Sequence, residues 1–268
     1  MKESIVREKM RRGEPILAAK TNFMNPDVAE MIGYAGFDVL WICNEHAYVN
    51  PENLKNILRT AKITGIDMMV RTSYGQGDYT DLIQPLEAGA QGLMVPHIHD
   101  RAQLEFIVKE CKFYPLGRRG VDGVNQDADQ GYAPLRDYLK FANDNTFIVA
   151  QIEDPEALEK AEEFASVKGI DVLFLGPADY SHSIGKAGDF RCPEVLSAIE
   201  KLSGICEKHG IYCGTVGFGE VDFCRRMIDS GVKFLGGPSD WSVCCSGFMA
   251  EIEKYKKAGL VSFREYGR

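Results

Sequence analysis

The chain has 268 residues, of which 45% are hydrophobic and 26% are charged, and its formal net charge at pH 7 is −8. These values are typical of a globular protein of one or two domains and exclude a disordered chain or a small disulfide-stapled scaffold. The acidic balance provides no positive field for nucleic acid, so we expect no nucleic-acid partner.

The N-terminus and the cysteines favour a cytoplasmic protein. The opening MKESIVREKMRRGEP is charged and lacks the roughly 7–15-residue apolar run of a signal peptide. No later stretch reaches the roughly 18 apolar residues of a membrane span, so we expect no membrane partner. The eight cysteines include no C-x-x-C pair, and we expect most of them to be buried thiols.

Short apolar runs alternate with longer segments of helical periodicity, the pattern of βαβ units around a parallel sheet. We predict strands at Ile16–Lys20, Phe37–Cys43, Ile66–Arg71, Gly92–Val95, Thr146–Ile152, Val172–Leu175, Ile211–Thr215 and Val232–Leu235. We predict helices at Pro26–Gly33, Pro51–Thr64, Asp81–Ala88, Arg101–Cys111, Asp154–Val167, Pro193–His209, Glu220–Ser230 and Asp240–Ala258. Eight such units predict a (β/α)8 TIM barrel, for which about 250 residues is typical.

One segment departs from the regular spacing. Residues at about 114–145 include GRRGVDGVNQDADQGYAP, which has little periodicity, so we expect a long loop there. Such a loop either shapes the active site or is a solvated excursion. We find no linker, and we therefore predict a single barrel domain over residues 1–268, ending in a helix at about 240–258.

The active site of such a barrel forms at the C-terminal ends of the strands. The residues there are Cys43-Asn44-Glu45-His46, Arg71, Pro96-His97, Gln151-Ile152-Glu153 and Gly176-Pro177-Ala178-Asp179. Glu153 and Asp179 end neighbouring strands, about 4.8 Å apart, so both carboxylates can approach one cation. Open oxygen ligation suits Mg²⁺, Mn²⁺ or a similar ion such as Co²⁺. The alternative is that Glu153 caps the next helix and Asp179 caps its own loop.

Two further strand ends carry groups suited to acid–base chemistry on a carbonyl compound. The guanidinium of Arg71 can clamp a carboxylate or a developing enolate, or else pair with a structural acid. His46 is the best-placed general base because imidazole titrates near neutral pH. A Schiff-base mechanism is disfavoured because the strands before Glu153 and Asp179 contain no lysine, although Lys20 and Lys233 flank other strands.

Six ordered segments resemble the HpcH/HpaI aldolase/citrate lyase family. They are AGFDVLWICNEHA, VRT, LEAGAQGLMVP, YPLGRRGV, DYLKFANDNTFIVAQIE and GIDVLFLGPADYS. The resemblance is greatest to the branch of 4-hydroxy-2-oxoheptanedioate and 2-dehydro-3-deoxy sugar-acid aldolases. It implies a class II aldolase that joins pyruvate to an aldehyde, or cleaves a 4-hydroxy-2-oxo acid, through a pyruvate enolate.

The resemblance also implies roles for individual residues and an assembly. Glu153 and Asp179 would bind the divalent cation, and Arg71 would contact the oxygens of pyruvate. His46 would be the catalytic acid/base, and Gln151 would line the pyruvate site with the backbone of Ala178 and Asp179. The family forms hexamers from exchanged-helix pairs, so we expect a homo-oligomer, a hexamer or a trimer.

Two positions depart from the family pattern. The usual D-G-E-H motif reads Cys43-Asn44-Glu45-His46 here, and the aspartate that partners the histidine appears as Glu87. Three alternatives therefore stay open. They are a citrate lyase or malyl-coenzyme A lyase type of enzyme, a phosphate-binding isomerase or epimerase suggested by the late glycines, and a metabolite-binding barrel without catalysis.

Overall fold

The computed structural model describes residues 1–47, 49–73 and 78–260. The strands are β1 (Ile16–Thr21), β2 (Val39–Cys43), β3 (Asp67–Arg71), β4 (Gly92–Val95), β5 (Phe147–Ile152), β6 (Val172–Leu175), β7 (Tyr212–Val216) and β8 (Val232–Ser239). The helices are α1 (Ile5–Arg12), α2 (Pro26–Tyr34), α3 (Pro51–Arg59), α4 (Ala61–Thr64), α5 (Tyr79–Glu87), α6 (Arg101–Cys111), η1 (Asp129–Gly131), α7 (Leu135–Asn145), α8 (Pro155–Glu159), α9 (Ala161–Ala165), α10 (Pro177–Ser183), α11 (Pro193–His209), α12 (Val221–Asp229) and α13 (Asp240–Lys257).

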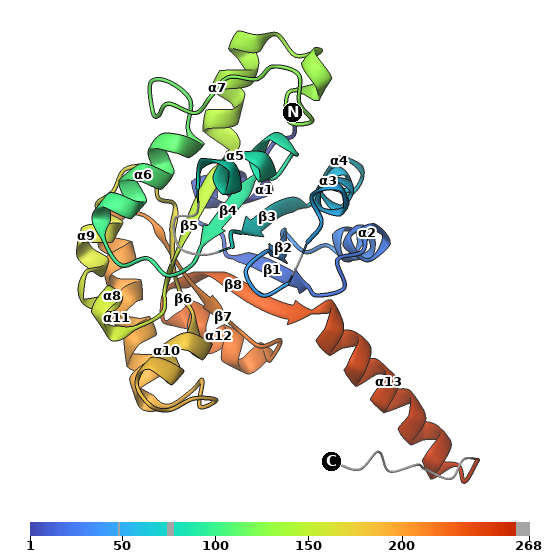
Figure 1. Cartoon of the computed structure of the whole chain (residues 1–268). Helices are drawn as coiled ribbons and strands as arrows, with labels where there is room; N and C mark the ends of the chain where they lie inside the picture. Colours follow the sequence, from blue (N-terminus) through green and yellow to red (C-terminus); the bar gives the residue numbers. More distant parts are fainter. Residues whose placement is uncertain (48, 74–77, 261–268) are drawn as a thin grey trace.

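The eight strands form a closed parallel barrel in chain order, with β8 paired to β1 (Figure 1). Helices surround the barrel, so the predicted (β/α)8 TIM barrel is confirmed. Each of the eight strands overlaps the segment predicted for it, and most ends differ by one or two residues. The continuous apolar runs were the decisive signal, because both faces of a barrel strand are buried.

Alternation along each strand decides which side chains face the barrel interior. Val39 and Trp41 belong to the interior cluster, whereas Leu40 and Ile42 pack in the outer cluster under the helices. Because successive strand side chains point to opposite faces, the next inward position after Trp41 is Cys43. The same count places several polar residues inward at the ends of their strands: Lys20, Arg71, Gln151 and Glu153.

The segment expected to be a loop at about 114–145 is only partly a loop. Its C-terminal part is α7, where Tyr138 and Ala142 lie one turn apart and pack against Phe113 in a small separate cluster. The prediction missed this helix because only a narrow stripe of its residues is apolar. The single-domain organisation over residues 1–268 stays a prediction.

The N-terminal helix α1, which the sequence pattern did not predict, packs at the end of the barrel where the strands begin. Asp67, the first residue of β3, is fully buried and accepts hydrogen bonds from Ser4 Oγ at 2.6 Å and Val6 N at 3.0 Å. Lys2 Nζ lies 2.5 Å from the same carboxylate. One buried acid therefore holds the segment that leads into α1.

We expect Asp67→Ala to lower the free energy of unfolding by about 3–5 kcal/mol, because it leaves a buried charge partner and two donors unpaired. The measurement is the urea midpoint of the purified protein. Lys254→Ala is the control, since it removes an exposed ion pair with Glu251 and should change stability by about 0.5 kcal/mol or less. Equal midpoints for both variants would contradict this account.

At the other end of the chain, α13 extends away from the barrel (Figure 1). Asp240, its first residue, is 7% exposed and accepts hydrogen bonds from Thr21 Oγ1 at 2.7 Å, Asn22 N at 2.7 Å and Phe23 N at 3.2 Å. This carboxylate ties the start of α13 to the end of β1. None of the helices in the described part of the chain has the length and apolar character of a membrane-crossing segment.

Candidate active site

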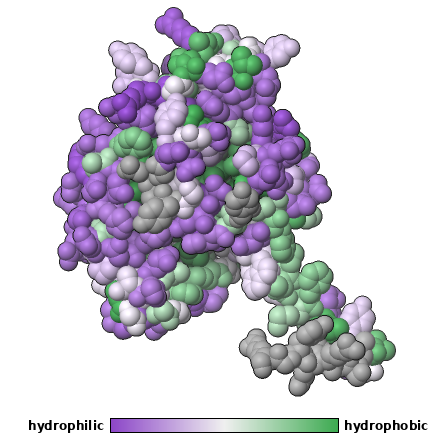
Figure 2. Space-filling model, viewed as in Figure 1, coloured by the Kyte–Doolittle hydropathy of each residue, from purple (hydrophilic) through white to green (hydrophobic). Residues whose placement is uncertain are grey.

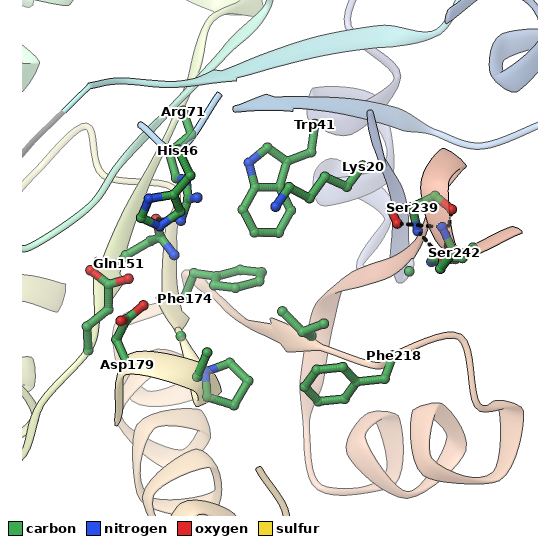
Figure 3. A pocket seen from close by; sticks show the side chains of 17 residues that line it. Lys20, Trp41, His46, Arg71, Gln151, Phe174, Asp179, Phe218, Ser239 and Ser242 are labelled. Carbon is green, nitrogen blue, oxygen red and sulfur yellow. Dashed lines mark hydrogen bonds between the residues drawn. The ribbon is translucent and has the colours of Figure 1, made fainter. Parts of the chain in front are cut away.

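The C-terminal strand ends surround a cavity of about 350 Å³ (Figure 3). Most of the candidate residues named from the sequence line it, namely His46, Arg71, Gln151, Glu153, Ala178 and Asp179. Arg71 and Gln151 are inward side chains of β3 and β5, and Ala178 and Asp179 lie in the first turn of α10. Parallel strands thus bring residues that are distant in sequence to one mouth.

Arg71 occupies the wall of this cavity and is 5% exposed. Its Nη2 donates to Cys43 Sγ at 2.9 Å, and its Nη1 lies 3.0 Å from Glu45 Oε2 and 3.5 Å from Gln151 Oε1. Its Nε is buried and donates to no described residue, while the side chain lines the cavity. The structural acid that the sequence left as an alternative partner for Arg71 is Glu45.

Glu45 and His97 form a buried connection that the sequence did not reveal. His97 Nε2 lies 2.9 Å from Glu45 Oε1, and its Nδ1 lies 3.4 Å from Glu153 Oε2. The backbone N–H of His97 also donates to Glu153 Oε2 at 2.8 Å. A network of ionisable side chains therefore runs from Arg71 through Glu45 and His97 to Glu153.

Glu153 is buried at the bottom of the cavity, and it is not a helix cap. The cap of α8 is its neighbour Asp154, whose side chain accepts from Ala157 N at 2.7 Å. Burial raises the pKa of Glu153, and the nearby charge of Asp179 raises it as well, while the hydrogen bond from His97 N lowers it. A carboxylate in this position is poorly solvated and gains from a neighbouring cation.

Cys43 takes the place of the usual family aspartate and faces Arg71. Burial alone would raise the pKa of the Cys43 thiol, but the charge of Arg71 and its hydrogen bond outweigh burial, so the pKa is lowered. The thiol sulfur also accepts the backbone N–H of His46 at 3.4 Å. The sulfur is therefore a hydrogen-bond acceptor for both Arg71 and the backbone of His46.

His46 and Glu87 are not brought together within the chain. The side chain of His46 is 63% exposed, and its nearest acid is Glu45, at 3.8 Å from Nε2 to Oε2. Glu87, the last residue of α5, lines a different cavity together with Asp122. Burial raises the pKa of Glu87, the charge of Arg119 lowers it, and that of Asp122 raises it. Within the chain these two residues line different cavities, and the pairing that the resemblance implied stays a prediction.

The donor set at the cavity fits a hard divalent cation. Among residues 1–47, 49–73 and 78–260, no three His, Cys, Asp or Glu side chains gather as a closed cage. The two carboxylates of Glu153 and Asp179 would be the protein ligands, a number that Mg²⁺ accepts because it keeps waters for substrate to displace. Gly176 makes room for this arrangement, since a Cβ there would lie only 3.1 Å from Glu153 Oε1.

A family model described as HpcH/HpaI aldolase/citrate lyase matches residues 21–245. That range contains all the cavity residues named above in this subsection, and Lys20 of β1, which also lines the cavity, lies just before it. The chain belongs to the HpcH/HpaI aldolase/citrate lyase family. The resemblance stated from six sequence motifs is confirmed. As a member of this family of carbon–carbon lyases, the chain brings residues of several of its motifs, among them His46, Arg71, Glu153 and Asp179, to one barrel mouth.

Similar proteins cover nearly the whole chain of this family member. A hydroxypyruvate/pyruvate aldolase of Delftia acidovorans is 32% identical over 92% of this chain and 90% of its own length. A 4-hydroxy-2-oxo-heptane-1,7-dioate aldolase of Escherichia coli is 32% identical over 87% of each chain. The crystal structure of an HpcH/HpaI aldolase/citrate lyase family protein from Burkholderia cenocepacia has a TM-score of 0.86 at 26% identity and covers 94% of this chain and 99% of its own.

Proposed function

We propose that this protein is a divalent-metal-dependent pyruvate aldolase that cleaves a 4-hydroxy-2-oxo acid to pyruvate and an aldehyde, and catalyses the reverse addition. One observation carries the proposal: Arg71, Gln151, Glu153 and Asp179 all face a single cavity at the strand ends. Both named aldolase relatives cover most of the chain, which supports the same reaction class.

In this proposal, Glu153 and Asp179 hold Mg²⁺, Mn²⁺ or Co²⁺, which when bound polarises the keto oxygen of pyruvate. Arg71, which lines the cavity, donates to the oxygens of pyruvate and stabilises the negative charge of the enolate as it develops. Gln151, held by the Nη1 of Arg71, lines the pyruvate site with the backbone of Ala178 and Asp179. The buried network behind Arg71 keeps the guanidinium in place before substrate arrives.

His46 moves the proton in this scheme. Its imidazole is exposed to the cavity, where it can take the hydroxyl proton of the 4-hydroxy-2-oxo acid during cleavage and return it during addition. Glu45 is the acid close enough to orient it. In this scheme Glu87 makes no direct contact with His46 of the same chain, because Glu87 lines the other cavity.

The decisive experiment measures exchange of the pyruvate methyl protons with deuterium by NMR, because it needs no knowledge of the aldehyde. We expect exchange with added Mg²⁺ and its loss with excess chelator. Exchange that persists in chelator would contradict the metal requirement. Absence of exchange from folded protein with any of the three metals would leave the alternative of a barrel that binds metabolites without catalysis.

We further propose a cytoplasmic homo-oligomer, a trimer or a hexamer, in which α13 contacts another copy. The helix is 18 residues long, stands away from the barrel and exposes large apolar side chains. The most exposed are Phe248 at 75%, Met249 at 68% and Trp241 at 57%. Figure 2 shows this apolar surface along the helix. An apolar face of this kind in an acidic chain is typical of an interface.

A further inference from the structure

Lys20 is a cation in the cavity that has no acid partner. It is the inward residue before the end of β1 and lines the cavity with Trp41, whose ring centroid lies 5.5 Å from Lys20 Nζ (Figure 3). Among residues 1–47, 49–73 and 78–260, no carboxylate lies within 4 Å of this ammonium. Burial, with a smaller contribution from Arg71, lowers the pKa of Lys20, and the charges of Cys43, Glu45 and Asp240 do not fully offset this.

The contrast with Arg71 shows why Lys20 needs an explanation. Arg71 faces the same Trp41 ring, at 5.3 Å, but its charge is matched by Glu45 and by Cys43. Lys20 contacts the ring, and the charges of Cys43, Glu45 and Asp240 act on it only from longer range. A partly buried ammonium with so little compensation is stabilised when an anion enters the cavity.

The barrel order places Lys20 across the mouth from the proposed metal ligands. Glu153 and Asp179 follow β5 and β6, whereas Lys20 is on β1, on the far side of the closed strand order. Figure 3 shows Lys20 reaching into the cavity from the wall opposite Asp179. Pyruvate held beside Asp179 therefore leaves the space in front of Lys20 for the second reactant.

The rest of that wall suits a short carbon chain ending in an acid. Trp41, Val216 and Phe218 supply apolar surface, and Ser239 and Ser242 supply hydroxyl groups at the start of α13. The wall therefore combines the Lys20 ammonium with apolar surface, and this combination suits a short carbon chain that ends in a carboxylate or a phosphate.

We infer that Lys20 binds an acid group at the far end of the acceptor aldehyde, so that the preferred acceptors are aldehydes carrying a carboxylate or a phosphate. This inference rests on the proposed aldolase function and specifies its second substrate. Lys20 acts here through charge, as a specificity-determining residue, and forms no covalent bond with the substrate.

The test compares acceptors that differ only in the acid group. Aldol addition of pyruvate is measured with 4-oxobutanoate against butanal, and with glyceraldehyde 3-phosphate against glyceraldehyde, as the ratio of kcat/KM values. We expect the wild type to prefer the acid in at least one pair, and the pair preferred identifies the acid. Lys20→Met should reduce that preference about 10- to 100-fold, and Lys20→Arg should restore much of it.

Lys233→Met is the matched control. Lys233 lies near the start of β8 over the ring of Tyr212, away from the mouth, so this variant removes a similar lysine–aromatic contact and should keep the preference. If Lys20→Met does not fold, Lys20→Gln replaces it. A wild-type enzyme without acid preference, or a Lys20 variant that keeps the full preference, would overturn the inference.

The same samples separate this inference from the function on which it rests. Absence of deuterium exchange into pyruvate by the wild type would mean that the proposed function fails. Exchange without acid preference would mean that only the role of Lys20 fails. Borohydride reduction in the presence of pyruvate, followed by mass spectrometry, should leave Lys20 unmodified. A reduced adduct on Lys20 would instead make it a Schiff-base nucleophile and overturn the charge role.

Discussion

Glu153→Gln and Asp179→Asn are each expected to slow metal-dependent exchange of the pyruvate methyl protons by about 10³-fold or more. Each change removes one of the two carboxylates proposed to hold the cation. The metal then loses affinity and position, and the several kcal/mol that it contributes to stabilising the enolate are lost. The neutral amides keep the size and shape of the side chains, so the barrel should stay folded.

The measurement combines exchange by NMR with Mn²⁺ binding by calorimetry, and circular dichroism checks the fold. Asp154→Asn is the matched control, because Asp154 is the next residue but caps α8 instead of facing the cavity. Asparagine caps a helix as well as aspartate does, so this variant should keep both metal binding and exchange. Full exchange activity in either cavity variant would remove that residue from the metal site.

Arg71→Lys is expected to lower kcat/KM by about 10²–10³-fold even though it keeps the charge. Arg71 contacts Cys43 and Glu45 from two separate nitrogens and also lines the cavity. A single ammonium cannot hold these partners and a substrate oxygen in the same geometry. The loss of one preorganised donor to a developing oxyanion has an effect of this size.

Steady-state kinetics of retro-aldol cleavage measure this effect, with pyruvate exchange as a second readout. Arg101→Lys is the control, because Arg101 pairs with Glu105 on the exposed surface of α6 and should tolerate the change. Normal kinetics in Arg71→Lys would show that the guanidinium fork is not required at this position.

Strand alternation made most of the cavity predictable from the sequence. A run such as FDVLWIC determines which residues face inward, and the barrel rule then places the last of them at the mouth. Arg71, Gln151 and Glu153 could be placed by this count alone. Asp179 follows from the next strand, because neighbouring strands of a parallel barrel end side by side.

The buried contacts beyond the strand ends could not be predicted in this way. Once a strand ends, the direction of a side chain depends on loop dihedrals that periodicity does not describe. His97 has a φ of +54°, a left-handed conformation that turns its backbone N–H toward Glu153. Glu45 was visible in the sequence next to His46, but its burial between Arg71 and His97 depends on that turn.

The position of Glu87 depends on the direction of a helix, which the resemblance alone does not give. The helix that follows a barrel strand runs back toward the opposite end of the barrel, and Glu87 is the last residue of α5. Its side chain therefore lies beside Asp122, in a cavity formed with the segment before α7. The sequence spacing matched, but the direction of the helix carries the acid away from His46.

The carboxylate of Asp240 links the start of α13 to the mouth of the barrel. It begins the helix and also holds the hydroxyl of Thr21 and the backbone of the residues after β1, directly beyond Lys20. If a ligand at Lys20 stabilises this junction, it also favours the position of α13 by the same free energy. A contact that holds α13 in turn favours binding of that ligand equally. The proposed assembly through α13 and the proposed ligand site at Lys20 would therefore be coupled in one thermodynamic cycle.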